Sequence, residues 1–442
     1  MPRTNSRRLS YTRLWTIGSG LLLLVAIAFA ASMSGHATAV AEAGSQSPYA
    51  PWLASPEASI DILHDFAGAP KDGSTPYSPV IRDSAGNLYG TTYWGGENDN
   101  GAIYKIVPSS KVTTLLYSFK GGKDGAGPYG GLIQDAVGNF YGTTVGGGDF
   151  GVGTLFQLNA AGAEKVEASF RVDTSGAYPY GGLIIDSAGN IYGTASYGGK
   201  GTCKLNGNKG CGTVFEISPS NGVFERKILH NFTGQTVGGD GAIPMGALLL
   251  DPQGNLYGTT YLGGRHNKGA VFKIEASGKE SVIHNFGEGP DGILPAAGLI
   301  RDFDGNLYGT TYYGGLYTMG AIFKIDTSGK ESVLHSFGLG SDGQNPAASL
   351  LMDAKGSIYG TTQYGGSLSC SILPGFGCGI IFKVGADGAE TILHNFKAEG
   401  DGAFPTASLI PDGQGNAFGT TTVDNKDSIM TFGTAFKIGV AQ

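Results

Sequence analysis

An element close to GNLYGTT recurs seven times along this chain of 442 residues. Its aromatic residue falls at Tyr89, Tyr141, Tyr192, Tyr257, Tyr308, Tyr359 and Phe418. The steps between successive copies are 52, 51, 65, 51, 51 and 59 residues, so the period is about 51 with two local insertions. A period near 50 residues is typical of repeated supersecondary units. The pattern therefore predicts an array of seven similar units.

Residues 280–331 show one unit in full. Alternating apolar and polar residues over 280–286 predict a strand, and shorter apolar runs at 297–302, 307–311 and 321–325 predict three more. The turns between them contain Gly, Asn and Asp, as tight hairpins require. Four antiparallel strands in about 50 residues are typical of a β-propeller blade. The predicted fold class is all-β, a seven-bladed β-propeller with four antiparallel strands per blade.

The first strand has no blade of its own. The strand type that ends in His-x-Phe appears at 60–66, before any complete unit, and the last unit lacks it. We therefore predict that the N-terminal strand completes the last blade and closes the ring, which leaves no open sheet edge. Strand alternation then places the blade-joining Asp-Gly loops and the Gly-Gly loops on one face, here called the variable face. Loop variation on a rigid scaffold commonly carries function.

The N-terminal region differs from the repeats. Four arginines precede an apolar run at 14–31, and an A-x-A site follows at 37–39. This pattern predicts a signal peptide and linker at 1–43, then a single propeller domain at 44–442 that is secreted or periplasmic in a bacterium. An uncleaved membrane anchor is the alternative, because the apolar run is almost long enough to span a bilayer. No membrane contact is expected beyond this segment.

Without its first 43 residues the chain holds 25 basic and 35 acidic residues, a net charge of about −10. An acidic surface argues against nucleic-acid binding, which needs basic side chains to displace counterions. The expected partner is an extracellular glycan or another surface protein, and the chain is expected to be a monomer. No cofactor is expected.

The four cysteines form two pairs eight residues apart, Cys203 with Cys211 and Cys370 with Cys378. Both pairs lie in the insertions that lengthen the period. In an exported protein such pairs predict disulfides that clip two long loops. A zinc site is the alternative, but no further Cys or His accompanies either pair, so no metal site is expected.

Two sets of polar residues recur with the repeat. Six aspartates stand four residues before the proline of the Asp-Gly loops, and Ser175 takes this place in the seventh; they are Asp72, Asp124, Asp240, Asp291, Asp342 and Asp401. They would bind a cation, sugar hydroxyls or a cationic ligand, or they accept backbone hydrogen bonds within their own turns.

Five histidines occupy one position of the outermost strand, where Tyr117 and Ala168 stand in the other two blades; they are His64, His230, His284, His335 and His394. Histidine is a common metal ligand and acid-base catalyst. Because the five fan outward in separate blades, they are not expected to converge on one ion. The preferred interpretation is a structural hydrogen bond between blades.

Aromatic residues follow the YGTT strands on the variable face: Tyr93, Trp94, Tyr197, Tyr261, Tyr312, Tyr313 and Tyr364. Exposed aromatic rings beside glycine-rich loops form a platform for carbohydrate, or they simply cover the blade tops. The tyrosines within the YGTT strands are expected to pack between blades. No nucleophile elbow, H-E-x-x-H motif or P-loop is present, so the catalytic residues, if any exist, are unknown.

The elements L-H-x-F, D-G-x-x-P, D-x-x-G-N-L-Y-G-T-T, Gly-Gly and G-x-x-F-K-I are complete at 282–325 and nearly complete in six other units. Together they resemble the bacterial GloVer-type tandem repeat family, over about residues 58–439. The resemblance implies an exported, β-propeller-like repeat protein, and this family carries no agreed activity to transfer. The D-x-x-G-N-L-Y part alone is similar to the lactonase and streptogramin-lyase group of propellers, without placing a catalytic histidine or metal ligand here.

Three functions follow as hypotheses. The leading one is a binding or scaffolding module whose ligand, such as a carbohydrate, lies on the variable face. The second is an extracellular polysaccharide-active enzyme, a glycosidase or lyase with carboxylates near the central channel. The third is an inert structural or adhesive surface protein. An enzyme is not favoured, because the repeat singles out no catalytic residue, and fold analogy alone does not decide.

Overall fold

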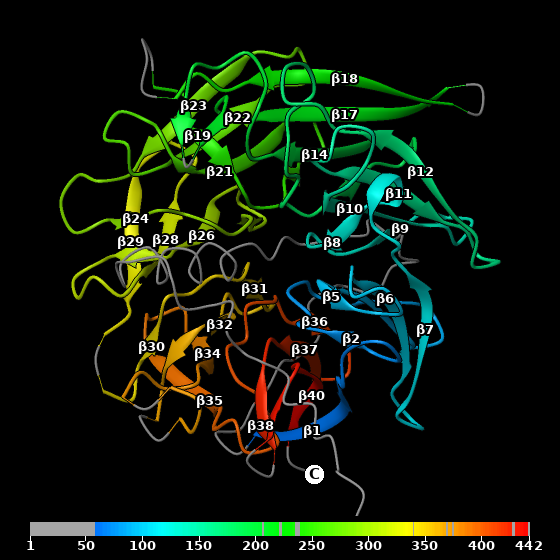
Figure 1. Cartoon of the computed structure of the whole chain (residues 1–442). Coiled ribbons are helices and arrows are strands. Elements are labelled where there is room, and N and C mark those ends of the chain that lie inside the picture. The colour runs from blue at the N-terminus through cyan, green and yellow to red at the C-terminus, as the bar shows by residue number, and fades with distance from the viewer. Residues whose placement is uncertain are drawn as a thin grey trace, which may run out of the picture.

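The computed structural model describes residues 58–440 except 206, 221–222, 235–238, 339, 368–369, 374 and 427–428. Besides one short 3-10 turn, η1 (Gly122–Asp124), the regular structure of these residues is antiparallel strand. Seven sheets of four or five strands follow one another around a ring (Figure 1). The predicted seven-bladed β-propeller is confirmed, whereas the predicted signal peptide lies outside the described residues. No helix in the described part of the chain is long and apolar enough to cross a membrane.

Each blade has four strand positions, and blade 1 begins at β3. The innermost strands are β3 (Ile81–Arg82), β9 (Ile133–Gln134), β13 (Ile184–Ile185), β20 (Leu249–Leu250), β25 (Ile300–Arg301), β31 (Leu351–Met352) and β36 (Ile410–Pro411). The second strands carry the YGTT element: β4 (Leu88–Thr92), β10 (Phe140–Gly146), β14 (Ile191–Ala195), β21 (Leu256–Leu262), β26 (Leu307–Thr311), β32 (Ile358–Thr362) and β37 (Ala417–Thr421).

The outer two positions complete each blade. The third strands are β6 (Ala102–Val107), β11 (Thr154–Leu158), β17 (Thr213–Ser220), β22 (Ala270–Ile274), β28 (Ala321–Ile325), β34 (Ile380–Val384) and β40 (Thr434–Val440). The outermost strands are β7 (Val112–Ser118), β12 (Glu164–Ser169), β18 (Val223–Asn231), β23 (Glu280–Asn285), β29 (Glu331–Ser336), β35 (Glu390–Asn395) and, for blade 7, β1 (Ala58–Asp65).

The first and last strands of the chain close the ring. β1 pairs antiparallel with β40, for example Ile60 with Ile438, and the last sheet has the order β1-β40-β37-β36. Figure 1 shows the blue β1 lying beside the red β40. The predicted closure by the N-terminal strand is confirmed.

The glycine of YGTT makes room for an aromatic ring of the neighbouring strand. In blade 5 Gly309 pairs with Phe323, and a Cβ on Gly309 would meet the ring of Phe323 at 2.6 Å. The six other blades place the same glycine under the equivalent ring, which is Tyr104 in blade 1 and Phe elsewhere. Covering a strand glycine with an aromatic ring stabilises a sheet that would otherwise lack a side chain there.

These same rings join the blades. The phenylalanine that follows each outermost strand packs against the ring of the next blade, with centroids 5.0 to 5.5 Å apart; six contacts are edge-on, and Phe396–Phe436 is tilted at 59°. The pairs are Phe66–Tyr104, Phe119–Phe156, Phe170–Phe215, Phe232–Phe272, Phe286–Phe323, Phe337–Phe382 and Phe396–Phe436. Edge-to-face aromatic pairs add about 0.5–1.5 kcal/mol each beyond the area they bury. The ring is therefore held by one repeated aromatic contact per interface.

The innermost strands are shorter than predicted. The expected strand at 297–302 pairs with its neighbour only as β25. Near the axis the blades converge, so the preceding backbone bonds across the interface instead: Thr259 donates to the carbonyl of Ala297 at 2.9 Å, and Gly298 donates to Ser349 Oγ at 3.0 Å.

The Asp-Gly loop and the Gly-Gly loop of each blade pair with one another, so the predicted variable face is confirmed. The paired segments are β2 (Gly73–Ser74) with β5 (Trp94–Gly95), β8 (Ala126–Pro128) with β10, β19 (Ala242–Pro244) with β21, β24 (Gly292–Ile293) with β27 (Tyr313–Gly314), and β30 (Gly343–Gln344) with β33 (Tyr364–Gly365). In blades 3 and 7 the two loops are joined by single antiparallel bridges, Ala177 with Tyr197 and Ala403 with Val423.

Both predicted disulfides form, Cys203–Cys211 and Cys370–Cys378. The first clips a small hairpin of β15 (Lys204–Leu205) and β16 (Asn208–Lys209) in the Gly-Gly loop of blade 3. Blade 7 adds a hairpin of β38 (Asp424–Lys426) and β39 (Ile429–Thr431). The described parts of these insertions therefore add to the variable face.

Candidate functional site

The D-x-x-G-N turns, opposite the variable face, are occupied by structural hydrogen bonds. Asp302 accepts from the backbone N–H and the side chain of Asn306 at 2.8 and 2.7 Å, and from the hydroxyl of Tyr308 at 2.9 Å. Burial alone would raise the pKa of Asp302, but these hydrogen bonds outweigh it and lower that pKa. The aspartate and the tyrosine of the repeated element thus hold the turn together.

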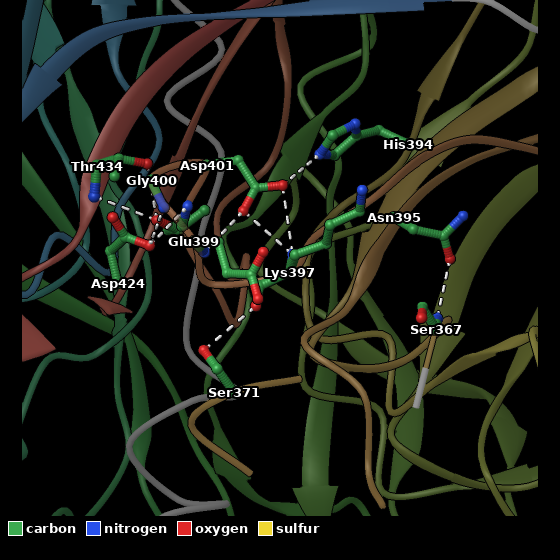
Figure 2. Close-up of polar contacts among 12 residues, drawn as sticks. Ser367, Ser371, His394, Asn395, Lys397, Glu399, Gly400, Asp401, Asp424 and Thr434 are labelled. Carbon is green, nitrogen blue, oxygen red and sulfur yellow. Dashed lines mark hydrogen bonds and ion pairs between the residues drawn. The ribbon is translucent and has the colours of Figure 1, made fainter. Parts of the chain in front are cut away.

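The aspartates of the Asp-Gly loops are held in a second repeated arrangement. Asp401 lies 3.1 Å from Nε2 of His394 and accepts the backbone N–H of Lys397 at 3.1 Å (Figure 2). Asp291 contacts His284 at 3.3 Å and accepts the N–H of Gly287 at 3.1 Å. Each aspartate therefore ties its loop to the end of the preceding outermost strand.

The other blades repeat this pairing with variations. Asp72 pairs with His64 at 2.9 Å and Asp240 with His230 at 3.0 Å, whereas Asp342 lies 3.6 Å from His335, beyond hydrogen-bond distance. Asp124 accepts from the hydroxyl of Tyr117 at 2.6 Å. In blade 3 Ser175 Oγ accepts the backbone N–H of Arg171 at 2.8 Å. The structure distributes the six aspartates among separate interfaces and does not gather them in one place.

The aromatic residues predicted as a platform differ in exposure. Trp94 and Tyr313 are 48% and 37% exposed, and Tyr93 and Tyr364 are half-buried. Three others are buried: Tyr197, Tyr261 and Tyr312. Tyr312 donates its hydroxyl to Gln363 at 2.6 Å. The accessible part of the predicted platform is therefore Tyr93, Trp94, Tyr313 and Tyr364.

Sequence reasoning missed a second group of tyrosines on this face. The residue after the proline of the Asp-Gly loop is Tyr77, Tyr129 and Tyr180 in blades 1 to 3, but Met245, Ala296, Ala347 and Thr406 in blades 4 to 7. This residue leads directly into the innermost segment of its blade. The signal was available as three Pro-Tyr dipeptides at equivalent positions, which make the axial end of the face asymmetric.

Seven aromatic residues join into one continuous aromatic arc across blades 1 to 3: Trp94, Tyr93, Tyr77, Tyr129, Tyr180, Tyr178 and Tyr197. Tyr77 stacks on Tyr129 with centroids 4.8 Å apart and planes at 18°, and Tyr178 stacks on Tyr180 at 6.4 Å and 20°. Edge-on contacts of 4.8 to 5.9 Å link the remaining neighbours. The seven rings are therefore in continuous contact; Trp94 is exposed, Tyr129 and Tyr197 are buried, and the other four rings are half-buried.

The hydroxyls of Tyr77 and Tyr364 on this face remain protonated at physiological pH. Burial, together with the hydroxyls of Tyr93 and Tyr364, raises the pKa of Tyr77 to about 12. Burial and the neighbouring Tyr313 likewise raise the pKa of Tyr364 to about 12. Protonated phenols both donate and accept hydrogen bonds, so the face offers neutral polar groups beside its rings.

The residue before each of these prolines adopts a left-handed conformation in all seven blades. They are Thr75, Gly127, Tyr178, Ile243, Leu294, Asn345 and Phe404, with φ between 55° and 62°. Their N–H groups donate to a carbonyl of the preceding blade's Gly-Gly loop region, as Tyr178 does to Val152 at 2.9 Å. A side chain at positive φ costs energy. Six blades nevertheless keep one here, each of a different type.

A cavity of about 220 Å³ lies beside Tyr178 at the end of the aromatic arc. Its lining residues are Val172, Ala177, Tyr178, Tyr197, Gly207, Asn208 and Lys209. The last three belong to the hairpin that the disulfide Cys203–Cys211 clips. The insertion in the repeat thus forms one wall of a pocket, and the aromatic arc forms another.

Known structures share the fold at low sequence identity. An oligogalacturonate lyase from Vibrio parahaemolyticus superposes with a TM-score of 0.54 at 10% identity, over 89% of this chain and 96% of that one. Virginiamycin B lyase from Staphylococcus aureus gives 0.51 at 14% identity, over 87% and 100%. The GH74 enzyme of Niastella koreensis gives 0.54 at 12% identity, over 85% of this chain and 53% of that one. No curated protein matches the chain in sequence.

The repeat itself identifies the family. The model of the Gloeobacter/Verrucomicrobia repeat matches residues 34–203 and 200–436, which together cover most of the chain. This match confirms the resemblance drawn from the repeated motifs. The chain belongs to the Gloeobacter/Verrucomicrobia repeat family.

Proposed function

We propose that this chain is an exported binding module that holds a carbohydrate on its variable face, at the aromatic arc of blades 1 to 3. The observation that carries the proposal is the arc itself, which ends in the cavity beside Tyr178. Sugar rings pack their C–H faces on aromatic rings, while their hydroxyls bond neighbouring polar groups. Asn208 and Lys209 offer such polar groups at the cavity.

The asymmetry of the ring supports a ligand over a purely structural role. If the tyrosines only shielded the ends of the strands from solvent, a similar residue would be expected at this position in every blade. Instead Tyr77, Tyr129 and Tyr180 are confined to three adjacent blades, and the small residues Ala296 and Ala347 occupy this position in blades 5 and 6.

Binding is favoured over the polysaccharide-active enzyme because the carboxylates that the repeat supplies are already engaged. The aspartates of the D-x-x-G-N turns bond their own asparagines or backbone, and those of the Asp-Gly loops bond His or Tyr and backbone N–H groups. Export is supported by the two disulfides, which persist in oxidising compartments.

A glycan array with the purified chain, followed by calorimetry with the best ligand, tests the proposal. Trp94→Ala and Tyr178→Ala are each expected to weaken binding about tenfold, equivalent to about 1.4 kcal/mol. Phe303→Ala is the matched control, because Phe303 is 82% exposed and lies in a D-x-x-G-N turn on the opposite face. The Phe303→Ala variant should bind the glycan with the same affinity as the unmodified chain.

Tyr178→Gly separates loss of the ring from loss of the fold. Tyr178 has a φ of 55°, and glycine adopts this conformation without strain. The relief offsets part of the lost packing, so this variant should melt near the unmodified chain and still bind about tenfold more weakly. An array without any glycan hit, or a Tyr178→Gly variant with unchanged affinity, would overturn the proposal and favour the inert structural protein.

A further inference from the structure

Three side chains from two blades meet at the interface between blades 5 and 6. His335 belongs to β29 of blade 5, Asp342 to the Asp-Gly loop that follows, and Glu390 to β35 of blade 6. The three side chains are only 15 to 20% exposed. They lie at the outer strands of the ring, far along the blade from the innermost strands that border the axis.

The spacing of the three groups is longer than a hydrogen bond. Nε2 of His335 lies 3.6 Å from Oδ1 of Asp342 and 3.9 Å from Oε1 of Glu390. A nitrogen and an oxygen at this distance are not hydrogen-bonded. Both Nε2 of His335 and Oε1 of Glu390 are buried and have no hydrogen-bond partner. Such buried, unpaired polar atoms cost free energy unless something else satisfies them.

The same spacing suits atoms that share one metal ion. Two ligands that each lie 2.0–2.2 Å from a zinc ion are roughly 3–4 Å from one another. The three donor atoms all lie within 4.8 Å of one another. One imidazole nitrogen with two carboxylate oxygens is a ligand set for Zn²⁺, whereas Mg²⁺ and Ca²⁺ prefer oxygen ligands alone.

A second interface brings the same residue types together with a different spacing. His230, Asp240 and Glu280, at the junction of blades 3 and 4, also bring their donor atoms within 4.8 Å of one another. There Oε1 of Glu280 is buried without a hydrogen-bond partner, but Nε2 of His230 is hydrogen-bonded to Oδ2 of Asp240 at 3.0 Å. We propose that the junction of blades 5 and 6 binds a zinc ion through His335, Asp342 and Glu390.

The remaining interfaces provide internal controls. The junction of blades 4 and 5 has the same residue types, but only two such clusters gather this closely in the described part of the chain. There Oε1 of Glu331 is buried without a hydrogen-bond partner, but His284 is hydrogen-bonded to Asp291 at 3.3 Å, as His230 is to Asp240 at 3.0 Å. The junction of blades 2 and 3 has Ala168, Ser175 and Arg226 at the three positions. A zinc ion at the proposed site would connect blades 5 and 6.

Calorimetry with ZnCl₂ on the EDTA-dialysed chain tests the proposal, with MgCl₂ as the comparison. We expect about one zinc ion per chain, a melting temperature that rises with zinc, and no response to magnesium. Glu390→Gln should abolish this zinc binding, whereas Glu280→Gln should leave it unchanged. Melting each variant without metal shows whether it is folded.

Glu331→Gln is the matched control, because it makes the same change at the equivalent position of the junction between blades 4 and 5. It should leave the zinc stoichiometry unchanged, as should Arg226→Gln. Absence of zinc binding by the unmodified chain would overturn the proposal. So would a loss of zinc in Glu331→Gln equal to that in Glu390→Gln, or an unchanged stoichiometry in the folded Glu390→Gln variant.

Discussion

The junction of blades 4 and 5 and the junction of blades 2 and 3 use the same aromatic contact beside different polar groups. Phe286 packs on Phe323 at 5.0 Å and 65°, and Phe170 packs on Phe215 at 5.2 Å and 60°. Next to the first pair stand His284, Asp291 and Glu331. Next to the second, the same positions hold Ala168, Ser175 and Arg226.

The replacements at the second junction are coordinated. Arg226 donates to the carbonyl of Ser169 at 3.0 Å and lies over the ring of Phe170, 5.6 Å from its centroid. Burial lowers the pKa of Arg226. Where Arg226 stands at the glutamate position, Ala168 and Ser175 stand at the histidine and aspartate positions. The aromatic contact therefore determines the geometry of the interface, whereas the polar residues beside it can change as a group.

The largest test of the shared geometry is removal of the strand that closes the ring. Deleting residues 44–66 removes β1 and the contact between Phe66 and Tyr104, and leaves an open edge on β40. We expect a loss of more than about 5 kcal/mol, because truncation of one buried Phe already costs about 3–5 kcal/mol. Chemical denaturation followed by circular dichroism measures it. Deletion of 44–57, which spares β1, is the control; equal stability of the two truncations would contradict closure by β1.

The second test compares the two aromatic contacts directly. Phe286→Ala and Phe170→Ala should each cost about 3–5 kcal/mol in the free energy of unfolding, because each removes a fully buried ring. If the aromatic contact dominates, the two losses should agree within about 1 kcal/mol despite the different polar neighbours. Urea denaturation of both variants measures the difference. A much smaller loss at Phe170 would show that Arg226 supports that interface independently.

The third test addresses the polar sets. Asp291→Ala removes the acceptor for His284 and for the N–H of Gly287 and should cost about 1–3 kcal/mol. Ser175→Ala removes the acceptor for one N–H, that of Arg171, and should cost about 0.5–1.5 kcal/mol. Melting temperatures of the two variants show the order. A larger loss at Ser175 than at Asp291 would show that the serine interface depends more on its polar contact.

Most of the fold was predictable because its signals are local and repeated. The alternation at 280–286, the turn residues and the orphan strand at 60–66 together implied seven blades and their closure, and both disulfides followed from cysteines only eight residues apart. The innermost strand at 297–302 was predicted too long, because its hydrogen bonds go to the neighbouring blade at the crowded axis. Hydrogen bonds between neighbouring blades at the axis leave no periodic pattern in the sequence of a single repeat.

The candidate site was predicted only in part for the same reason. Trp94 and Tyr313 were recognised because they follow a strand of known direction, and both are exposed. Tyr178 was missed because its importance depends on a left-handed backbone and on a cavity wall that comes from the disulfide hairpin. The histidines were predicted to form hydrogen bonds between blades. The proximity of Glu390 to His335 was not predicted, because Glu390 lies 55 residues later in the sequence, which is more than one repeat.

The smallest expected effect concerns pH at the junction of blades 1 and 2, where Tyr117, Asp124 and Glu164 meet. Burial and the charge of Asp124 raise the pKa of Glu164 from 4.5 to about 7. The folded chain therefore holds a proton that the unfolded chain releases between these values. Stability from this group is complete below pH 4.5 and is lost as the pH rises through 7.

Glu164→Gln cannot titrate, so its free energy of unfolding relative to the unmodified chain should increase between pH 4.5 and 7.5. We expect a change below about 1 kcal/mol, because Glu164 is only half-buried and solvent screens its interactions. Denaturation at a series of pH values measures it. Arg226→Gln changes the equivalent position of the next junction to the same residue but removes no group that titrates in this range, so its offset from the unmodified chain should stay constant. A constant offset for Glu164→Gln as well would mean that Glu164 is ionised in the folded chain, and that the acidic junction differs from the arginine junction in packing alone.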